Sequence, residues 1–471
     1  MFKRFFLILL LQIILLQPLI SQVEYTVTIQ GNQKNGYPSS LLADEEFVFL
    51  AYSMRQGYNE DYSGTAKIDE KGVIVDSLIF LPQSDTITHV WDIKKTSQAG
   101  VYSGCGTKNM QDDILYVWLF EFNSQMQVLW ETIIDTLHFV PARMEHQVVE
   151  ENRYIFCSDR RTCFYNFNKT TGSVIKNDSY AGTVEHLTPI PPENNTFLIN
   201  DPKDPAKTIV LDSAFETVGD GVIFTERPLR HPPDCGFINN TEFVVTRRFD
   251  DNDNLSIIMT KVEVSSMEIL ATKTFRYEFS MGGIGMLGVH TTLALQKDYF
   301  FAFGASLLQF APTPVVKFDN NLFLYAFNHD FDSLWSIQFD FDAYYWPFSI
   351  VATPDGGCVI GATRYDWHTE EDNYFCDAFI MKISKPDFTS ISEAEKSKPL
   401  VTIFPNPGNN QFLIQTELVN FTLQLYDLQG QLLLTQHNRK EVNTEKLPSG
   451  CYIYRVIADS GEAMHGKWVK R

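Results

Sequence analysis

The chain has 471 residues, with 58 Asp and Glu against 38 Lys and Arg, and a formal net charge of -20. Hydrophobic residues make up 44% of the chain and aromatic residues 14%, which is enough for a large core and excludes an acidic disordered chain. Seven cysteines are too few for a disulfide-based miniprotein, and the negative charge argues against nucleic acid or an anionic membrane as the main partner.

Residues 1–21 have the pattern of a secretory signal peptide. The basic pair Lys3 and Arg4 precedes the apolar run 5–16, and we expect cleavage before Gln22. A membrane anchor is the alternative, but the run is short for a span and a glutamine interrupts it. No later stretch reaches the ~18 apolar residues of a span, so we expect no transmembrane span in the mature chain.

Residues 22–384 repeat one unit of short strands, with no convincing long amphipathic helix. Each unit has a first strand, a tight polar turn, an apolar second strand, a loop and further strands. Seven second strands can be placed, at 47–53, 100–107, 154–159, 196–200, 242–247, 299–305 and 358–363. The repeat predicts an all-β fold, a seven-bladed β-propeller whose stacked sheets bury aromatic faces against one another. Tandem β-sandwiches or a β-helix are the alternatives. The last unit, TPDGGCVIGAT at 353–363 with DAFIMKI at 377–383, resembles the loose propeller repeats of secreted Bacteroidetes proteins.

Five histidines stand at the head of the first strand in consecutive units. They are His89, His146, His186, His231 and His290, and we expect Glu145, Glu185, Arg230 and Trp346 nearby. Because first strands line the channel of a propeller, these side chains are predicted to meet at one channel mouth and bind a ligand. With aromatic residues they can hold a sugar or a peptide, and neutral imidazoles can also bind a transition metal. The alternative is that they hydrogen-bond to the backbone of the hub and to water.

The sequence was also searched for catalytic motifs, metal sites and disulfides. The chain has no HExxH, GxSxG, GxGxxG or P-loop motif, and no CxxC pair that predicts a metal site. We expect no cofactor and no metal site. Calcium is the alternative, through the turn DDNDN at 250–254, which lacks the glycine and distal glutamate of a calcium hand. A solvated hairpin tip is the alternative there. Cys157 and Cys163 flank a predicted hairpin and are a disulfide candidate, with buried thiols as the alternative.

The end of the chain changes character. Residues 385–399 are polar, contain two prolines and are predicted to be a linker. Residues 400–471 then alternate short strands with Gly and Pro, the pattern of a small Ig-like β-sandwich.

Four ordered blocks of this segment resemble the type A C-terminal sorting domain of the Bacteroidetes type IX secretion system. The blocks are VTIFPNPGNNQFLI at 401–414, LYDLQGQLL at 425–433, LPSGCYIYRV at 447–456 and GKWVKR at 466–471. The motif positions are Pro405, Asn406, Pro407, Asp427, Gly430, Gly450, Tyr452 and Lys467. Cys451 departs from the aliphatic residue usual in the family. The resemblance implies handling by the type IX machinery, export to the outer-membrane surface, and removal of the domain or its exchange for surface attachment. An ordinary accessory β-sandwich is the alternative.

These features predict a secreted or surface-attached binding or interaction protein whose propeller contacts an extracellular glycan or protein. A propeller hydrolase or lyase acting on polysaccharide or peptide through hub His and Glu residues is one alternative, and a structural surface component is another. The missing catalytic motifs favour the binding role. Residues 22–399 carry 29 Lys and Arg against 52 Asp and Glu, so the propeller should repel anionic polymers.

Overall fold

In the computed structural model, every regular element of the described residues is a β-strand. The structure describes residues 23–470 apart from 31–34, 56–61, 82–86, 110–113, 140, 142, 160, 185, 192–194, 202, 205–206, 224–233, 252–253, 277–283, 286–292, 307–319, 341–342, 369–375, 387, 389–400, 405–407, 417, 419, 428–430 and 459–462. The chain divides into two compact units, Met1–Ser392 and Glu393–Arg471. The predicted signal peptide lies outside the described residues.

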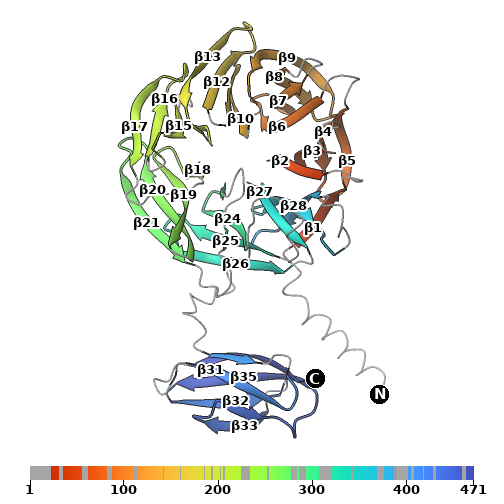
Figure 1. Cartoon of the computed structure of the whole chain (residues 1–471), viewed down its shortest axis with the longest axis vertical. Helices are drawn as coiled ribbons and strands as arrows, with labels where there is room; N and C mark the ends of the chain where they lie inside the picture. Colours follow the sequence, from red (N-terminus) through yellow and green to blue (C-terminus); the bar gives the residue numbers. More distant parts are fainter. Residues whose placement is uncertain are drawn as a thin grey trace. The chain divides into compact units, whose positions relative to one another are not determined.

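The first unit is a ring of antiparallel sheets, which we number as blades in chain order (Figure 1). Blade 1 contains β2 (Asn35–Ala43), β3 (Val48–Arg55), β4 (Tyr62–Ile68) and β5 (Ile74–Phe80). Blade 2 contains β6 (Ile87–Lys95), β7 (Val101–Asn109), β8 (Leu115–Asn123) and β9 (Val128–Leu137). Blade 3 contains β10 (Arg143–Val149), β11 (Asn152–Ser158), β12 (Arg161–Asn168) and β13 (Val174–Ala181).

The remaining blades follow the same order. Blade 4 contains β14 (Thr188–Pro189), β15 (Phe197–Asn200), β16 (Lys207–Leu211) and β17 (Thr217–Ile223). Blade 5 contains β18 (Asp234–Phe237), β19 (Glu242–Asp251), β20 (Asn254–Glu263) and β21 (Ile269–Arg276). Blade 6 contains β22 (Ile284–Gly285), β23 (Leu293–Leu295), β24 (Tyr299–Ser306), β25 (Asn321–Asn328) and β26 (Ser333–Asp340). Blade 7 contains β27 (Tyr344–Ala352), β28 (Cys358–Tyr365) and β29 (Asp377–Ile383).

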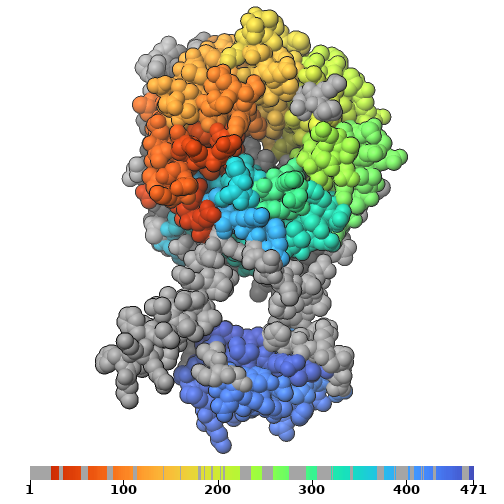
Figure 2. Space-filling model, turned by 180° about the vertical axis from the view of Figure 1, so that it is seen from behind, coloured from red at the N-terminus to blue at the C-terminus, as the bar shows by residue number. Residues whose placement is uncertain are grey.

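The ring is closed by the start of the chain. Strand β1 (Val23–Ile29) pairs antiparallel with β29 and forms the outer strand of blade 7. The seven predicted second strands are β3, β7, β11, β15, β19, β24 and β28, so the prediction of a seven-bladed propeller is confirmed. The first strands lie nearest the centre of the ring, and a narrow hollow remains there in the space-filling view (Figure 2).

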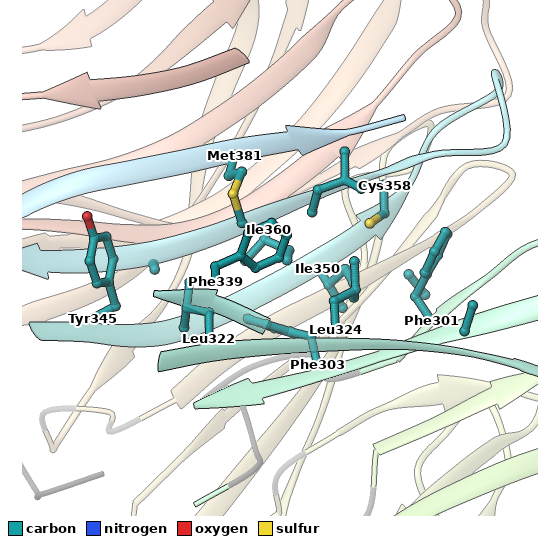
Figure 3. Packing of buried hydrophobic residues seen from close by; sticks show 14 of the residues in the cluster. Phe301, Phe303, Leu322, Leu324, Phe339, Tyr345, Ile350, Cys358, Ile360 and Met381 are labelled. Carbon is teal, nitrogen blue, oxygen red and sulfur yellow. The ribbon is translucent and has the colours of Figure 1, made fainter. Parts of the chain in front are cut away.

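Hydrophobic clusters hold neighbouring blades together. Each of the seven junctions between adjacent blades has its own cluster of buried side chains. Between blades 6 and 7, for example, Phe303 and Leu324 pack against Ile350, Ile360 and other residues of blade 7 (Figure 3). Because a single sheet has two apolar faces, stacking the blades removes both from water, which accounts for the high aromatic content of the chain.

Several blades share a turn between their third and fourth strands. In blade 2 the Asn123 carboxamide oxygen accepts the backbone N–H groups of Gln125 (3.1 Å) and Gln127 (2.9 Å). The same acceptor position is held by Asp69, Asp212 and Asn328. The fourth residue of these turns has positive φ, and at Phe215 and Phe331 it is an aromatic residue buried at the junction with the previous blade. The ~1 kcal/mol cost of left-handed backbone is thus offset by the ~1.5–3 kcal/mol gained by burying the ring.

The second unit is a small two-sheet β-sandwich, as predicted. One sheet contains β30 (Val401–Phe404), β31 (Gln411–Thr416) and β34 (Glu441–Asn443). The other contains β33 (Leu432–His437), β32 (Phe421–Tyr426), β35 (Gly450–Ala458) and β36 (Ala463–Lys470). Both sheets contribute to one core, in which the fully buried Trp468 packs against Phe412 with ring centroids 4.8 Å apart.

Candidate functional site at the propeller hub

A pocket of about 160 Å³ opens at the hub, where the first strands of blades 1, 2, 3 and 7 approach one another. Its volume is several times the ~30 Å³ share of one water molecule in the liquid. It is lined by Ser39, Ser40, Leu41, Trp91, Asp92, Lys94, Arg143, Met144, Glu145, Ser349, Ile350 and Val351. The pocket therefore combines three hydroxyls, two cations and two carboxylates with an aromatic ring and aliphatic walls.

Asp92 is the centre of a buried polar network at this pocket. Its carboxylate accepts hydrogen bonds from Ser40 Oγ (2.7 Å) and from the backbone N–H groups of Ile93 (2.9 Å) and His146 (3.1 Å). His146 Nδ1 lies 3.2 Å from Asp92 Oδ2, and Lys94 Nζ lies 3.3 Å from the same oxygen. The network ties the first strands of blades 1, 2 and 3 together, because its members come from β2, β6 and β10.

Asp92, His146 and Ser103 have the connectivity of a Ser-His-Asp catalytic triad. His146 Nε2 lies 3.2 Å from Ser103 Oγ, on the opposite side of the ring from Asp92. A carboxylate only accepts, so Nδ1 carries the imidazole proton and Ser103 donates to Nε2. However, Ser103 and His146 are 0% exposed, so no substrate can reach the hydroxyl. The triad is therefore a structural link between blades 2 and 3 and not a nucleophile.

Burial and charge set the protonation of this network. Burial alone would raise the pKa of the Asp92 carboxyl, but Lys94, His146 and Ser40 outweigh it and hold the pKa well below its usual range. Burial lowers the pKa of the His146 imidazole more than Asp92 raises it, so the ring is neutral at pH 7. Burial would also lower the pKa of the Lys94 ammonium, but Asp92 and Glu145 raise it, so Lys94 is charged.

Glu145 joins this network to the next blade. One carboxylate oxygen lies 3.9 Å from Lys94 Nζ and the other 3.5 Å from His186 Nδ1. On the far side of that imidazole, Arg143 Nη2 lies 3.2 Å from His186 Nε2. Arginine only donates, so His186 Nε2 accepts and its Nδ1 carries the proton that faces Glu145.

His89 and Trp91 stand on the neighbouring strand β6. His89 Nε2 lies 3.2 Å from Ser53 Oγ of blade 1, and the His89 and Trp91 rings lie 4.5 Å apart between centroids. Trp91 is half-buried and contributes to the pocket wall. Trp346 lies on β27, which also contributes to the pocket, but its side chain packs against a cluster of Tyr344, Tyr365 and Cys376.

Of the predicted site residues that the structure describes, Glu145 lines the hub pocket, whereas His89, His146, His186 and Trp346 are not among its lining residues. His89, His146 and His186 each contact a residue of the preceding blade, so they link blades as well as standing at the hub. Glu145 lies between His186 and Lys94 in the pocket wall. His231, His290, Glu185 and Arg230 lie outside the described residues, so the convergence of all five histidines stays a prediction.

Ser349 is an unusual member of the pocket wall. It is 4% exposed, and its Oγ atom has no hydrogen-bond partner within the described residues. An unsatisfied buried hydroxyl costs about 1–3 kcal/mol, so Ser349 is an energetically costly residue at this position.

Several of these residues were missed by the sequence reasoning. Lys94, Arg143 and Ser349 carry no motif, and Asp92 was one of many carboxylates near a first strand. One local signal existed, because the block THVWDI at 88–93 places His89, Trp91 and Asp92 within five positions.

Cys157 and Cys163 face each other directly across strands β11 and β12. Opposite positions in an antiparallel pair have Cα atoms ~4.5–5.5 Å apart, within the range of a disulfide. Both cysteines are buried and are free thiols in this structure. Their disulfide stays a prediction.

A second pocket of about 160 Å³ lies at the junction of blades 7 and 1. It is lined by seven carboxylate residues, Glu24, Asp44, Glu45, Glu46, Asp69, Glu70 and Asp355, together with Lys382 and several other residues. Lys382 donates to Asp355 Oδ2 (2.6 Å) and to Thr353 Oγ1 (3.1 Å), which fastens the turn between β27 and β28 to β29. Within the described residues, no group of three or more His, Cys, Asp or Glu side chains is arranged to hold a metal ion. The predicted calcium turn at 250–254 lies partly outside those residues.

Two of the described sorting-motif residues, Asp427 and Tyr452, stabilise the C-terminal sandwich. Asp427 accepts the backbone N–H of Gln431 (2.8 Å) and so shapes the turn after β32. Tyr452 packs in the core beside Trp468, whereas Lys467 is exposed. Gly450 begins β35, and a Cβ atom there would meet no other atom within 4 Å. Pro405, Asn406, Pro407 and Gly430 lie outside the described residues.

Residues 402–471 match a family model described as a secretion system C-terminal sorting domain. This confirms the predicted type IX sorting domain and makes the chain an exported β-propeller protein. The domain directs the chain to secretion and to the outer-membrane or cell surface through the type IX machinery.

Three solved structures are similar to this chain at low sequence identity. Raptor from Chaetomium thermophilum is 11% identical with a TM-score of 0.46, and the match covers 78% of this chain and 29% of that chain. The WD40 domain of SCAP from fission yeast is 8% identical with a TM-score of 0.39, and the match covers 76% of this chain and 99% of that chain. U3-55K is 12% identical with a TM-score of 0.46, and the match covers 76% of this chain and 98% of that chain. The chain thus spans less than a third of the Raptor chain.

The search of curated proteins found no match. No helix in the described part of the chain is long and apolar enough to cross a membrane.

Proposed function

We propose that this chain is a binding protein of the Bacteroidetes cell surface, which holds a group of an extracellular glycan or protein in its hub pocket. The observation that carries the proposal is the pocket itself, where polar groups from four blades converge among apolar walls. Such an arrangement is typical of ligand sites, in which few polar groups orient a ligand within a largely hydrophobic hollow. The sorting domain supports the proposal, because it delivers the propeller to the place where such ligands occur.

The chemistry of the hub favours binding over hydrolysis. Glycoside cleavage needs two carboxyl groups, one of which stays protonated to act as an acid. Asp92 is fully engaged by donors that hold its pKa low, so it cannot supply a proton near neutral pH. The Ser103 hydroxyl is sealed from solvent.

The test is binding of the purified mature chain to glycan and peptide arrays, with and without EDTA. Trp91→Ala removes a pocket wall and should weaken binding at least about tenfold, because a stacked aromatic ring contributes on the order of 1.5 kcal/mol beyond its area. Trp367→Ala is the matched control, since Trp367 is equally half-buried but lies outside the pocket. Array binding that both variants retain would contradict the hub site. Release of cleavage products would instead support an enzyme.

A further inference from the structure

We propose that the hub pocket takes one neutral sugar residue, an inference that rests on the proposed binding function. The charges of the pocket wall are already paired within the protein. Lys94 lies 3.3 Å from Asp92 and 3.9 Å from Glu145, and Arg143 bonds to His186, which faces Glu145. Two cations thus balance two carboxylates. A charged ligand would find no unpaired opposite charge in this low-dielectric pocket, so its transfer from water would be unfavourable. A neutral ligand needs no such charged partner.

The remaining hydrogen-bonding capacity matches hydroxyl groups. Lys94 can only donate and Glu145 can only accept, and their charged atoms are 3.9 Å apart. A hydroxyl both donates and accepts, so one sugar hydroxyl can bridge this pair. Ser349 Oγ, buried and without a partner within the described residues, offers a further donor and acceptor from blade 7.

The apolar part of the wall suits the ring of a sugar. Trp91 lies beside the polar pair, and Leu41, Ile350 and Val351 complete the wall from blades 1 and 7. A pyranose has an apolar C–H face and a polar rim, so an aromatic ring and a set of hydroxyl partners recognise it together.

The experiment measures binding to the mature chain by ligand-observed NMR. The probes are methyl glycosides of glucose, galactose, mannose and N-acetylglucosamine, with glucuronic acid, glucosamine and an end-capped peptide as comparators. Ser349→Ala should weaken binding of a neutral glycoside about three- to tenfold, because one hydrogen bond is lost. The melting temperature should stay the same or rise, because the variant removes an unsatisfied buried hydroxyl.

Thr65→Val is the matched control. Thr65 is also buried, and its hydroxyl has no partner among the residues that the structure describes, but it does not line the pocket, so glycoside binding should be unchanged. Neutral glycosides that bind equally well to the Ser349→Ala variant would overturn the placement of the site. If only charged sugars or the peptide bind, and Trp91→Ala abolishes that binding, the sugar inference fails while the proposed function stands. If no probe and no array ligand binds, both fail.

Discussion

At the scale of single residues, the hub shows how one buried side chain can join two blades. His146 bonds to Asp92 and Ser103 of the preceding blade and is completely buried. The sequence pattern predicts that histidines stand at the heads of first strands; in the structure His89 and His146 lie within β6 and β10, and His186 lies just before β14. Their partners could not be predicted, because Asp92 and His146 are 54 positions apart and meet only when two blades stack.

His146 should make the propeller sensitive to mild acid. Its pKa is lowered in the folded state, so the unfolded chain binds more protons once the pH falls below about 6.5. Stability is therefore present above that pH and lost below it, by up to about 1.4 kcal/mol per pH unit from this residue. We expect urea unfolding at pH 7.5 and 5.5 to show the loss in the wild type and a smaller difference in His146→Gln.

His138→Gln provides the control for this prediction. His138 is exposed, so its replacement should leave the difference between the two pH values as in the wild type. A His146→Gln profile as steep as the wild-type profile would show that other groups cause the acid sensitivity.

At the scale of elements, strand β1 decides how the ring closes. It pairs with β29, which lies at the other end of the propeller's sequence, and Val27 packs in the cluster between blades 7 and 1. The alternation of β1 is visible in the sequence VEYTVTI, but its partner is not, because nothing local links residues 23–29 to residues 377–383.

A matched pair of substitutions on β1 tests this closure. Val27→Asp places a carboxylate in the junction and should lower the free energy of unfolding by at least about 2 kcal/mol, through lost burial and the cost of a buried charge. Thr26→Asp adds the same charge on the exposed face and should change stability by less than about 1 kcal/mol. Urea unfolding measures both, and equal effects would argue against a closing role for β1.

At the scale of the whole molecule, the two units have separate roles. The propeller carries the acidic charge and the hub pocket, and residues 402–471 carry the export signal. The sequence showed this division more clearly than anything else, because the sorting blocks are contiguous and each has a local pattern. The sandwich holds its core independently, with Trp468 and Phe412 at the centre.

Because the two roles lie in different units, we expect changes in the sorting domain to reduce surface delivery without unfolding the propeller. Trp468→Ala should destabilise the sorting domain by about 3–5 kcal/mol, because it empties a fully buried site. Surface delivery, measured by protease accessibility on intact cells, should then fall, as we also expect when residues 400–471 are deleted. Thr435→Ala, an exposed change on β33, should leave delivery intact.

Unfolding of the propeller completes that test. The urea transition of the propeller should be the same in all these variants, because the described residues of the sandwich form a core cluster of their own. Normal surface delivery of the chain that lacks residues 400–471 would refute the role of the sorting domain.

The amino-acid sequence by itself determined the all-β class, the seven repeated units and the sorting domain. These follow from alternating apolar residues, turn residues and contiguous motifs, all of which act over a few neighbouring positions. Only the tertiary structure decided that β1 closes blade 7, that the histidines link blades, and that Ser349 lines a pocket with Lys94 and Glu145 and has no hydrogen-bond partner among the described residues. The physical reason is that these contacts join residues from different blades, and the stacking of whole sheets, with burial of their apolar faces, brings them together.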